Sequence, residues 1–291
     1  MMYIFLTTGD TVPEEMPRIL AGAFGVQVVE TDVSDSSELE SRNWDAMVTC
    51  EYEHLAGDLR WSLNIYAAEE VEQQPSEEHL ARHLAQQLGR PVFFTWNGGL
   101  PWIRRVALPE GGLTLARVAE PDDEKTGFSV EAAEAPISGI PPVPVTHFPE
   151  VVRAFEIPTP ATDAVVPREA SEEQNKVRGL LVNWERLCVR MRSNWPPSGW
   201  YSAALYQEDL EYRDELETFL KGLPDHDQRQ RVGEVLGELD AHYRELTIAD
   251  EGRALAAALG QEAADLAGRS WYWHRCPQPL PWVEGRDAVA R

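Results

Sequence analysis

Proline limits how this chain can fold more than any other feature, because it is concentrated in one segment. Residues 136–168 of the 291-residue chain contain eight prolines, in phrases such as GIPPVPV and IPTPAT. Proline lacks a backbone N–H and has a fixed φ, so the segment cannot continue a helix or form a central strand. It also has too many apolar side chains for a solvated tether: Val143, Val145, Phe148, Val151, Val152, Phe155 and Ile157. We therefore predict a domain over 1–135, an ordered linker or strap over 136–171, and a second domain over 172–291.

The first part alternates between short apolar runs and helical segments. We expect strands at 3–8, 26–32 and 91–97, and hairpins within 46–67 and 102–119. Helices are expected at 13–24 and at 76–88, where serine precedes two glutamates at the start of the helix. This order predicts an α+β fold in which a mainly antiparallel sheet carries two helices on one face.

The last part has the 3.6-residue periodicity of amphipathic helices. Apolar side chains mark three helices, at about 177–188, 206–223 and 232–246. We expect a fourth, Ala-rich helix from Thr247, whose spacing to Asp250 resembles a capping box, to about Gly268. Four consecutive helices with short connections predict an antiparallel helical bundle.

The segment WYWHRCPQPLPW (271–282) has two interpretations. Large aromatic side chains at the open end of a bundle commonly fold over it, which would make the segment a cap on the core. Alternatively, Trp271, Trp273 and His274 bind a partner, because Trp, Tyr and Arg dominate interface energies and proline-rich flanks would hold them rigidly. In that case the protein would be a scaffold or regulatory adaptor.

Charge restricts the class of partner. The net charge is −23, and residues 1–135 contribute −15 of it, from 9 basic and 24 acidic side chains. Such a chain repels nucleic acid and anionic membranes and attracts basic proteins. The candidate contact residues are the carboxylates near the first predicted hairpin and the second helix: Glu51, Glu53, Asp58, Glu69, Glu70, Glu72, Glu77 and Glu78.

Catalytic, cofactor and metal motifs are missing from the sequence. His79 and His83 lie one helical turn apart, but the glutamate of a zincin motif is lacking. The three cysteines, at 50, 188 and 276, form no CxxC pair, which favours reduced thiols over a disulfide framework. We therefore expect no catalytic residue, no cofactor and no metal, and we interpret the protein as non-enzymatic. An enzyme whose site lacks a recognisable motif is the remaining alternative. Without a signal sequence or a long apolar run, the expected location is the cytoplasm.

The phrase YQEDLEYRDELETFLKGLPDHDQRQRVGEVLGELDAHYRELTIAD (206–250), followed by WYWHRCP (271–277), resembles a helical segment of small actinobacterial proteins, some of which are encoded beside polymorphic toxins. The acidic first half is also similar in style to the immunity proteins of such bacterial systems. The resemblance implies an immunity or antitoxin-like protein that neutralises a basic effector, for example a nuclease, by blocking its active site or substrate groove. It carries over no catalytic residue. Carboxylates on a rigid sheet would act there as a mimic of a phosphate array.

Overall fold

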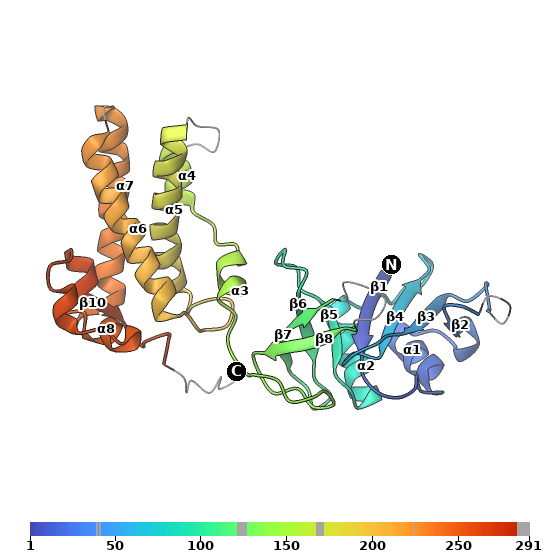
Figure 1. The fold of residues 1–291 in the computed structure, drawn as a ribbon. Coiled ribbons are helices and arrows are strands. Elements are labelled where there is room, and N and C mark those ends of the chain that lie inside the picture. Colours follow the sequence, from blue (N-terminus) through green and yellow to red (C-terminus); the bar gives the residue numbers. More distant parts are fainter. Residues whose placement is uncertain (39, 41, 121–126, 167–171, 224, 284–291) are drawn as a thin grey trace. The chain divides into compact units, whose positions relative to one another are not determined.

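The chain forms two compact units, Met1–Phe148 and Pro149–Arg291 (Figure 1). The structure is a computed structural model, and it describes residues 1–283 apart from 39, 41, 121–126, 167–171 and 224. The first unit is a sheet with helices and the second is helical, which confirms the expected α+β class. The proline-rich segment is divided between the two units.

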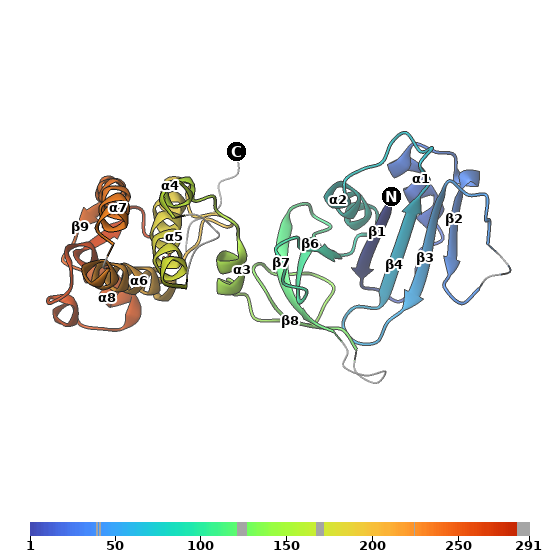
Figure 2. The ribbon, with the colours of Figure 1, turned by 90° about the horizontal axis from the view of Figure 1, so that it is seen from above.

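One eight-stranded sheet forms the first unit, in the order β2-β3-β4-β1-β5-β6-β7-β8 (Figure 2). Neighbouring strands run antiparallel, except that β2 and β3 are parallel. The expectation of a mainly antiparallel sheet is therefore confirmed. The strands are β1 (Met2–Thr7), β2 (Thr31–Asp35), β3 (Val48–His54), β4 (Trp61–Ala67), β5 (Val92–Thr95), β6 (Ile103–Ala107), β7 (Leu113–Ala119) and β8 (Ser129–Ala133).

Both helices of this unit cover the same face of the sheet. They are α1 (Met16–Phe24) and α2 (Glu77–Leu88). Because side chains alternate along a strand, Tyr3 and Phe5 of β1 are buried among residues of these helices, whereas Met2 and Ile4 lie on the opposite face. The prediction of two helices on one face is confirmed.

Local sequence signals fix the ends of these helices. The Ser76 side chain accepts a hydrogen bond from the His79 backbone N–H (3.3 Å) at the start of α2. Gly25 and Gly89 follow α1 and α2 with left-handed φ angles of 67° and 63°, where a glycine is free of strain.

The strand expected at 26–32 is displaced toward the C-terminus. Residues Val28–Glu30 form a 3₁₀ helix, and β2 begins only at Thr31. The Glu30 carboxylate accepts a hydrogen bond from the Gln27 backbone N–H (2.7 Å), which closes a turn where alternation alone indicated extended chain. Strand β8 was also not expected from the sequence.

The face opposite the helices has a core of its own, centred on β5 to β8. Its buried members are Leu6, Leu59, Phe93, Val106, Ala116, Val118, Val130, Ala133 and Ile137. The first part of the proline-rich segment covers this core: Ile140 and Val143 pack against it, and Val145 forms a parallel bridge with Ala133.

The turn between β3 and β4 is fastened to the start of β8. Asp58 N–H donates to the Phe128 carbonyl (2.7 Å), Phe128 N–H donates to the Ala56 carbonyl (2.9 Å), and the Asp58 carboxylate accepts from Val130 N–H (2.9 Å). A Cβ added to Gly57, which has a φ of 97°, would lie 2.2 Å from the Phe128 carbonyl oxygen. Two backbones can approach this closely only where the side chain is absent.

The second unit has helices α3 (Pro149–Ala154), α4 (Pro160–Val165), α5 (Glu172–Arg192), α6 (Ala203–Gly222), α7 (His226–Leu246) and α8 (Arg253–Leu259), and strands β9 (Thr247–Ala249) and β10 (Arg275–Pro277). Helix α5 packs against both α6 and α7. Trp184 of α5 is fully buried between them, and its indole N–H donates a hydrogen bond to the Asp240 carboxylate of α7 (3.0 Å). The same carboxylate accepts a hydrogen bond from the Arg213 guanidinium of α6 (2.8 Å). The buried carboxylate thereby joins three helices.

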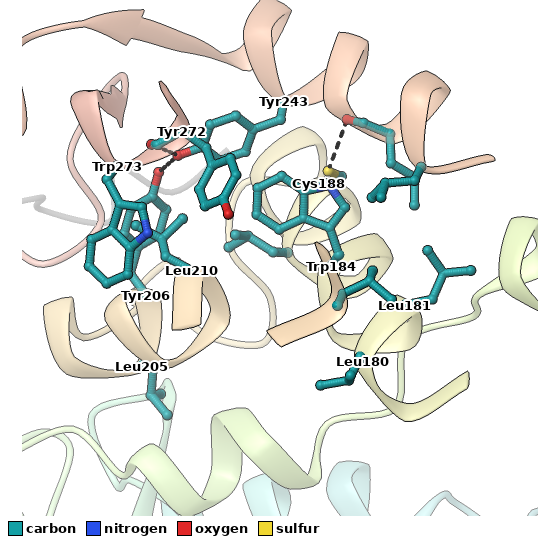
Figure 3. Close-up of a cluster of buried hydrophobic side chains, with 14 of the residues drawn as sticks. Leu180, Leu181, Trp184, Cys188, Leu205, Tyr206, Leu210, Tyr243, Tyr272 and Trp273 are labelled. Carbon is teal, nitrogen blue, oxygen red and sulfur yellow. Dashed lines mark hydrogen bonds between the residues drawn. The ribbon is translucent and has the colours of Figure 1, made fainter. Parts of the chain in front are cut away.

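The aromatic segment near the C-terminus belongs to this core (Figure 3). Tyr272 and Trp273 are fully buried, and both donate hydrogen bonds to the Asp214 carboxylate of α6; the Trp273 distance is 3.0 Å. Tyr243 of α7 bonds to the hydroxyl of Tyr206 and donates to the Tyr272 carbonyl (2.9 Å). The segment therefore caps the helical core, which agrees with the interpretation of the sequence as a core cap.

The expectation of a long fourth helix over 247–268 is wrong. Thr247 to Ala249 form strand β9 paired with β10, and α8 spans only Arg253–Leu259. Gly252 and Gly260 flank α8 with left-handed φ angles of 76° and 67°, so the backbone turns out of the helix at both ends.

Replacement of Gly57 by alanine should destabilise the protein by roughly 2–5 kcal/mol, since left-handed strain adds to overlap with Phe128. Gly111→Ala is the control, because Gly111 has a similar φ of 93° and open space around its Cβ position. It should lose only about 1 kcal/mol. Urea unfolding of both variants measures the difference; equal losses would show that the close approach of the two backbones is unimportant.

Trp273→Ala should lower the free energy of unfolding by about 3–5 kcal/mol, because it empties a fully buried site and removes one donor to Asp214. Ile248→Ala is the control, since Ile248 is exposed on the neighbouring strand. Its effect should stay within about 0.5 kcal/mol. A melting temperature that Trp273→Ala leaves unchanged would contradict the role of this segment as a core cap.

Candidate functional site

The face of β2, β3, β4 and β1 that lies away from the helices is the most prominent candidate surface, and we call it the open face. Strand register places its side chains in two cross-strand rows. They are Asp32–Thr49–Tyr66–Met2 and Ser34–Glu51–Asn64–Ile4, with Glu53 and Ser62 paired beyond them. The alternate positions on the same strands, such as Cys50 and Ile65, are buried under α1 and α2.

Large apolar side chains are exposed on the open face. Met2 is 64% exposed, Ile4 47% and Tyr66 50%. Met2 and Tyr66 are direct cross-strand partners, and Ile4 follows on the same side of β1. Clustered exposed apolar side chains on a folded protein typically mark an interaction surface.

An exposed tryptophan follows two residues that contact this surface, Arg42 at Glu51 of β3 and Asn43 at Asp32 of β2. Trp44 is 71% exposed and lies against the guanidinium of Arg42, 5.5 Å from the ring centroid. Arg42 is held beneath it by Glu51 (2.5 Å) and by the carbonyl of Ser36 (3.1 Å). The Asn43 N–H donates to Asp32 (3.0 Å), which fixes the same loop to the sheet. Trp44 is thus presented to solvent on a well-anchored base.

The eight candidate carboxylates do not gather on one face. Glu51 and Glu53 lie together on the open face, and Asp58 is engaged in the turn that meets β8. The connection that follows β4 after Ala67 carries three exposed carboxylates, Glu69, Glu70 and Glu72. Glu77 and Glu78 begin α2, which covers the other face.

Guanidinium groups neutralise two of the eight carboxylates. Arg42 pairs with Glu51, and Arg105 and Arg82 pair with Glu78 at 2.6 and 3.1 Å. Burial raises the pKa of Glu78, but the two arginines outweigh it and hold that pKa below its ordinary value. Of the other six, Glu53, Glu69, Glu70 and Glu72 are exposed, whereas Asp58 and Glu77 are partly buried.

The alternative contact residues have structural partners. Trp273 is fully buried, and Trp271 is partly buried with Arg244 stacked 3.6 Å from its ring centroid. Nε2 of His274 lies 3.0 Å from the Leu266 carbonyl oxygen. These three side chains pack within the helical unit.

The histidines and cysteines considered as metal ligands or nucleophiles do not form a site. His79 is exposed, whereas Nε2 of His83 lies 3.3 Å from the Ile19 carbonyl. Cys50, Cys188 and Cys276 are buried and unpaired, and burial raises the pKa of each thiol to about 12. Thiols that stay protonated at neutral pH are weak nucleophiles. In the described part of the chain, no three His, Cys, Asp or Glu side chains are grouped to hold a metal ion.

Comparisons with protein-family models, curated protein sequences and solved structures gave no match. Within the residues that the structure describes, every helix is too short or too polar to span a bilayer. The open face is therefore the feature of the molecule that bears most directly on function.

The apolar members of the open face were missed in the sequence. The sequence MYIFLT does contain a signal for them, because apolar residues occupy both the odd and the even positions of this strand, and so both of its faces. Such a run indicates burial on both faces. Helices cover only one face at Met2 and Ile4, so the second set of side chains is left in solvent.

Glu78→Gln should lower the melting temperature slightly at pH 7, because it removes charge from two ion pairs at the start of α2. Both partners are partly exposed and screened by water, so we expect about 0.5 kcal/mol. The pKa of Glu78 is lowered in the folded state, so this stability is present above the unfolded pKa and is lost as pH falls through the folded pKa.

The control for this measurement is Glu72→Gln, which removes an exposed carboxylate nearby. At every pH from 3 to 7, the melting temperature of Glu72→Gln should equal that of the wild type. A difference between wild type and Glu78→Gln that persisted at pH 3 would contradict the ionic origin of the effect.

Proposed function

We propose that this protein is a non-enzymatic binding protein of the immunity or antitoxin type, and that its open face binds a basic effector protein. The supporting observation is the combination of exposed Met2, Ile4, Tyr66 and Trp44 with acidic neighbours on a sheet that helices cover only on the other side.

The apolar side chains would supply most of the affinity. Tryptophan and tyrosine are the most frequent hot spots of interfaces, and they are most effective where a partner excludes water from them. Tyr66 lies inside the sheet and Trp44 on an anchored loop, so both are held in position before a partner arrives.

The charge of the first unit would supply orientation and speed. Glu53 lies on the open face, and Glu69 and Glu70 lie in the connection that follows Tyr66. A negative field around an apolar centre attracts a basic partner from a distance and disfavours acidic competitors. A nuclease is a suitable effector, because its substrate groove is basic and carboxylates can occupy phosphate positions. Blocking that groove would neutralise the effector, and we propose that this binding takes place in the cytoplasm.

Affinity capture from an extract of the encoding organism tests the proposal. The full chain is used as bait beside Tyr66→Ala and Glu53→Lys, with Ile248→Ala and Glu238→Lys as matched controls on exposed positions of the helical unit. We expect a basic protein that both controls retain and both open-face variants lose. Glu53→Lys and both controls should stay within about 0.5 kcal/mol of wild-type stability, and Tyr66→Ala, on a central strand, should lose no more than about 1 kcal/mol.

Titration of the purified captured protein then gives the physical signature. The charge-reversed variant Glu53→Lys should bind at least about tenfold more weakly at 50 mM salt, and wild-type affinity should fall as salt rises to 500 mM. Capture of no basic protein, or binding that is indifferent to both salt and the open-face variants, would refute the proposal.

A further inference from the structure

The helical unit contains a cavity of about 240 Å³ between α3, α5 and α6. Helix α5 lines it with Asn183, Arg186, Leu187 and Arg190, and α6 lines it with Leu205, Glu208, Asp209 and Tyr212. Val152, Arg153 and Tyr201 complete the wall. Three arginines around one cavity are unusual in a chain with a net charge of −23.

Arg190 brings a fixed positive charge to this cavity. It is only 4% exposed, and its guanidinium donates to the carbonyls of Pro196 (2.9 Å) and Val152 (2.7 Å). Two backbone carbonyls orient the guanidinium without cancelling its charge. In the described part of the chain, no carboxylate oxygen lies within 4.0 Å of it. Burial lowers the pKa of Arg190, and the nearby Asp209 carboxylate opposes this effect only in part.

Arg186 is one helical turn from Arg190 and adds a second charge. Its Nε atom is buried and has no hydrogen-bond partner among the described residues. Repulsion from Arg186 is one cause of the lowered pKa of Arg190. Two adjacent guanidinium groups and an unused buried donor make a site that an anion would complete, because each guanidinium can bind a carboxylate through two N–H groups.

The two acidic side chains of the wall, Glu208 and Asp209, limit how much negative charge a ligand in the cavity can carry. Glu208 is occupied by a two-oxygen pair with Arg153, both at 2.7 Å. Asp209 accepts a hydrogen bond from the Tyr201 hydroxyl (2.5 Å), and burial raises its pKa to about 7. Because its pKa is raised, Asp209 carries less negative charge near neutral pH than an ordinary carboxylate, so it opposes a bound monoanion weakly and a dianion more strongly.

We propose that this cavity binds a small organic monocarboxylate. The carboxylate would lie between Arg186 and Arg190, and the organic part would contact Leu187, Leu205 and Tyr212. Most of the lining is polar, so the arginines would fix the ligand's orientation, and Leu187, Leu205 and Tyr212 would give a smaller apolar contact.

Binding of carboxylates beside their uncharged amides tests the proposal. Full-length protein is titrated with formate, acetate, propionate and benzoate, with formamide, acetamide, propionamide and benzamide as counterparts, and with inorganic phosphate. At least one carboxylate should bind with a Kd of about 1 mM or tighter and raise the melting temperature by several degrees at 100 mM. Its amide should bind at least about tenfold more weakly, as expected for loss of a charge-assisted pair.

Arg186→Met separates a binding role from a structural role. Because Nε of Arg186 has no partner, the variant should match or exceed the wild-type melting temperature without ligand, while its carboxylate affinity falls at least about tenfold. Arg192→Met is the control, since Arg192 is an exposed residue of the same helix that does not line the cavity. It should bind as wild type does.

The pH dependence gives a second readout. The charged and titratable groups that face Asp209 are Arg153 from α3, Arg186 and Arg190 from α5, Glu208 and Tyr212 from α6, and Tyr201. Protonation of Asp209 removes the negative charge nearest the ligand, so affinity should rise as pH falls from 8 to 6, and Asp209→Asn should abolish this rise.

Several results would overturn the proposal. They are binding of phosphate alone, equal binding of carboxylate and amide, no binding by any of the four carboxylates, or a loss in Arg192→Met equal to that in Arg186→Met. A fall in the melting temperature of ligand-free Arg186→Met with unchanged affinity would assign Arg186 to structure only.

Discussion

Strand alternation is the constraint on which the first unit depends. A sheet presents two faces, and α1 and α2 both cover the same one. Residues 136–148 contribute to the cover over β5 to β8 on the other face, while Met2, Ile4 and Tyr66 remain in solvent. The register that buries Tyr3 and Phe5 therefore also exposes their neighbours Met2 and Ile4. Core formation and the proposed binding surface follow from the same alternation.

Local signals in the sequence predicted most elements of the fold and their order. Ser76, Gly25 and Gly89 mark helix ends through contacts within a few residues, so they can be identified without a structure. Strand pairing is different, because Glu51 meets Arg42 and Asn64 only after the sheet has formed. Clustering along the chain consequently grouped eight carboxylates that the structure places on different elements, and the exposed aromatic residues were not identified at all.

In the helical unit, aromatic composition alone could not distinguish a cap from an interface. The distinction depends on Asp214, which lies 58 and 59 residues before the two side chains that donate to it. The arginine-lined cavity was hidden for a similar reason: Arg153, Arg186 and Arg190 come from two helices, and their periodicity is that of an ordinary solvated face. Charge counts along a chain do not reveal which cations become buried.

The contact between the β3–β4 turn and the start of β8 has a consequence for the proposed binding surface. Glu51 and Glu53 lie on the arm of a hairpin whose tip is tied down by three hydrogen bonds. A free hairpin would sample many orientations and lose them on association. This hairpin is already held by β2 and β1 at its sides and by Phe128 and Val130 at its tip, so the conformational entropy lost on complex formation would fall mainly on the other molecule.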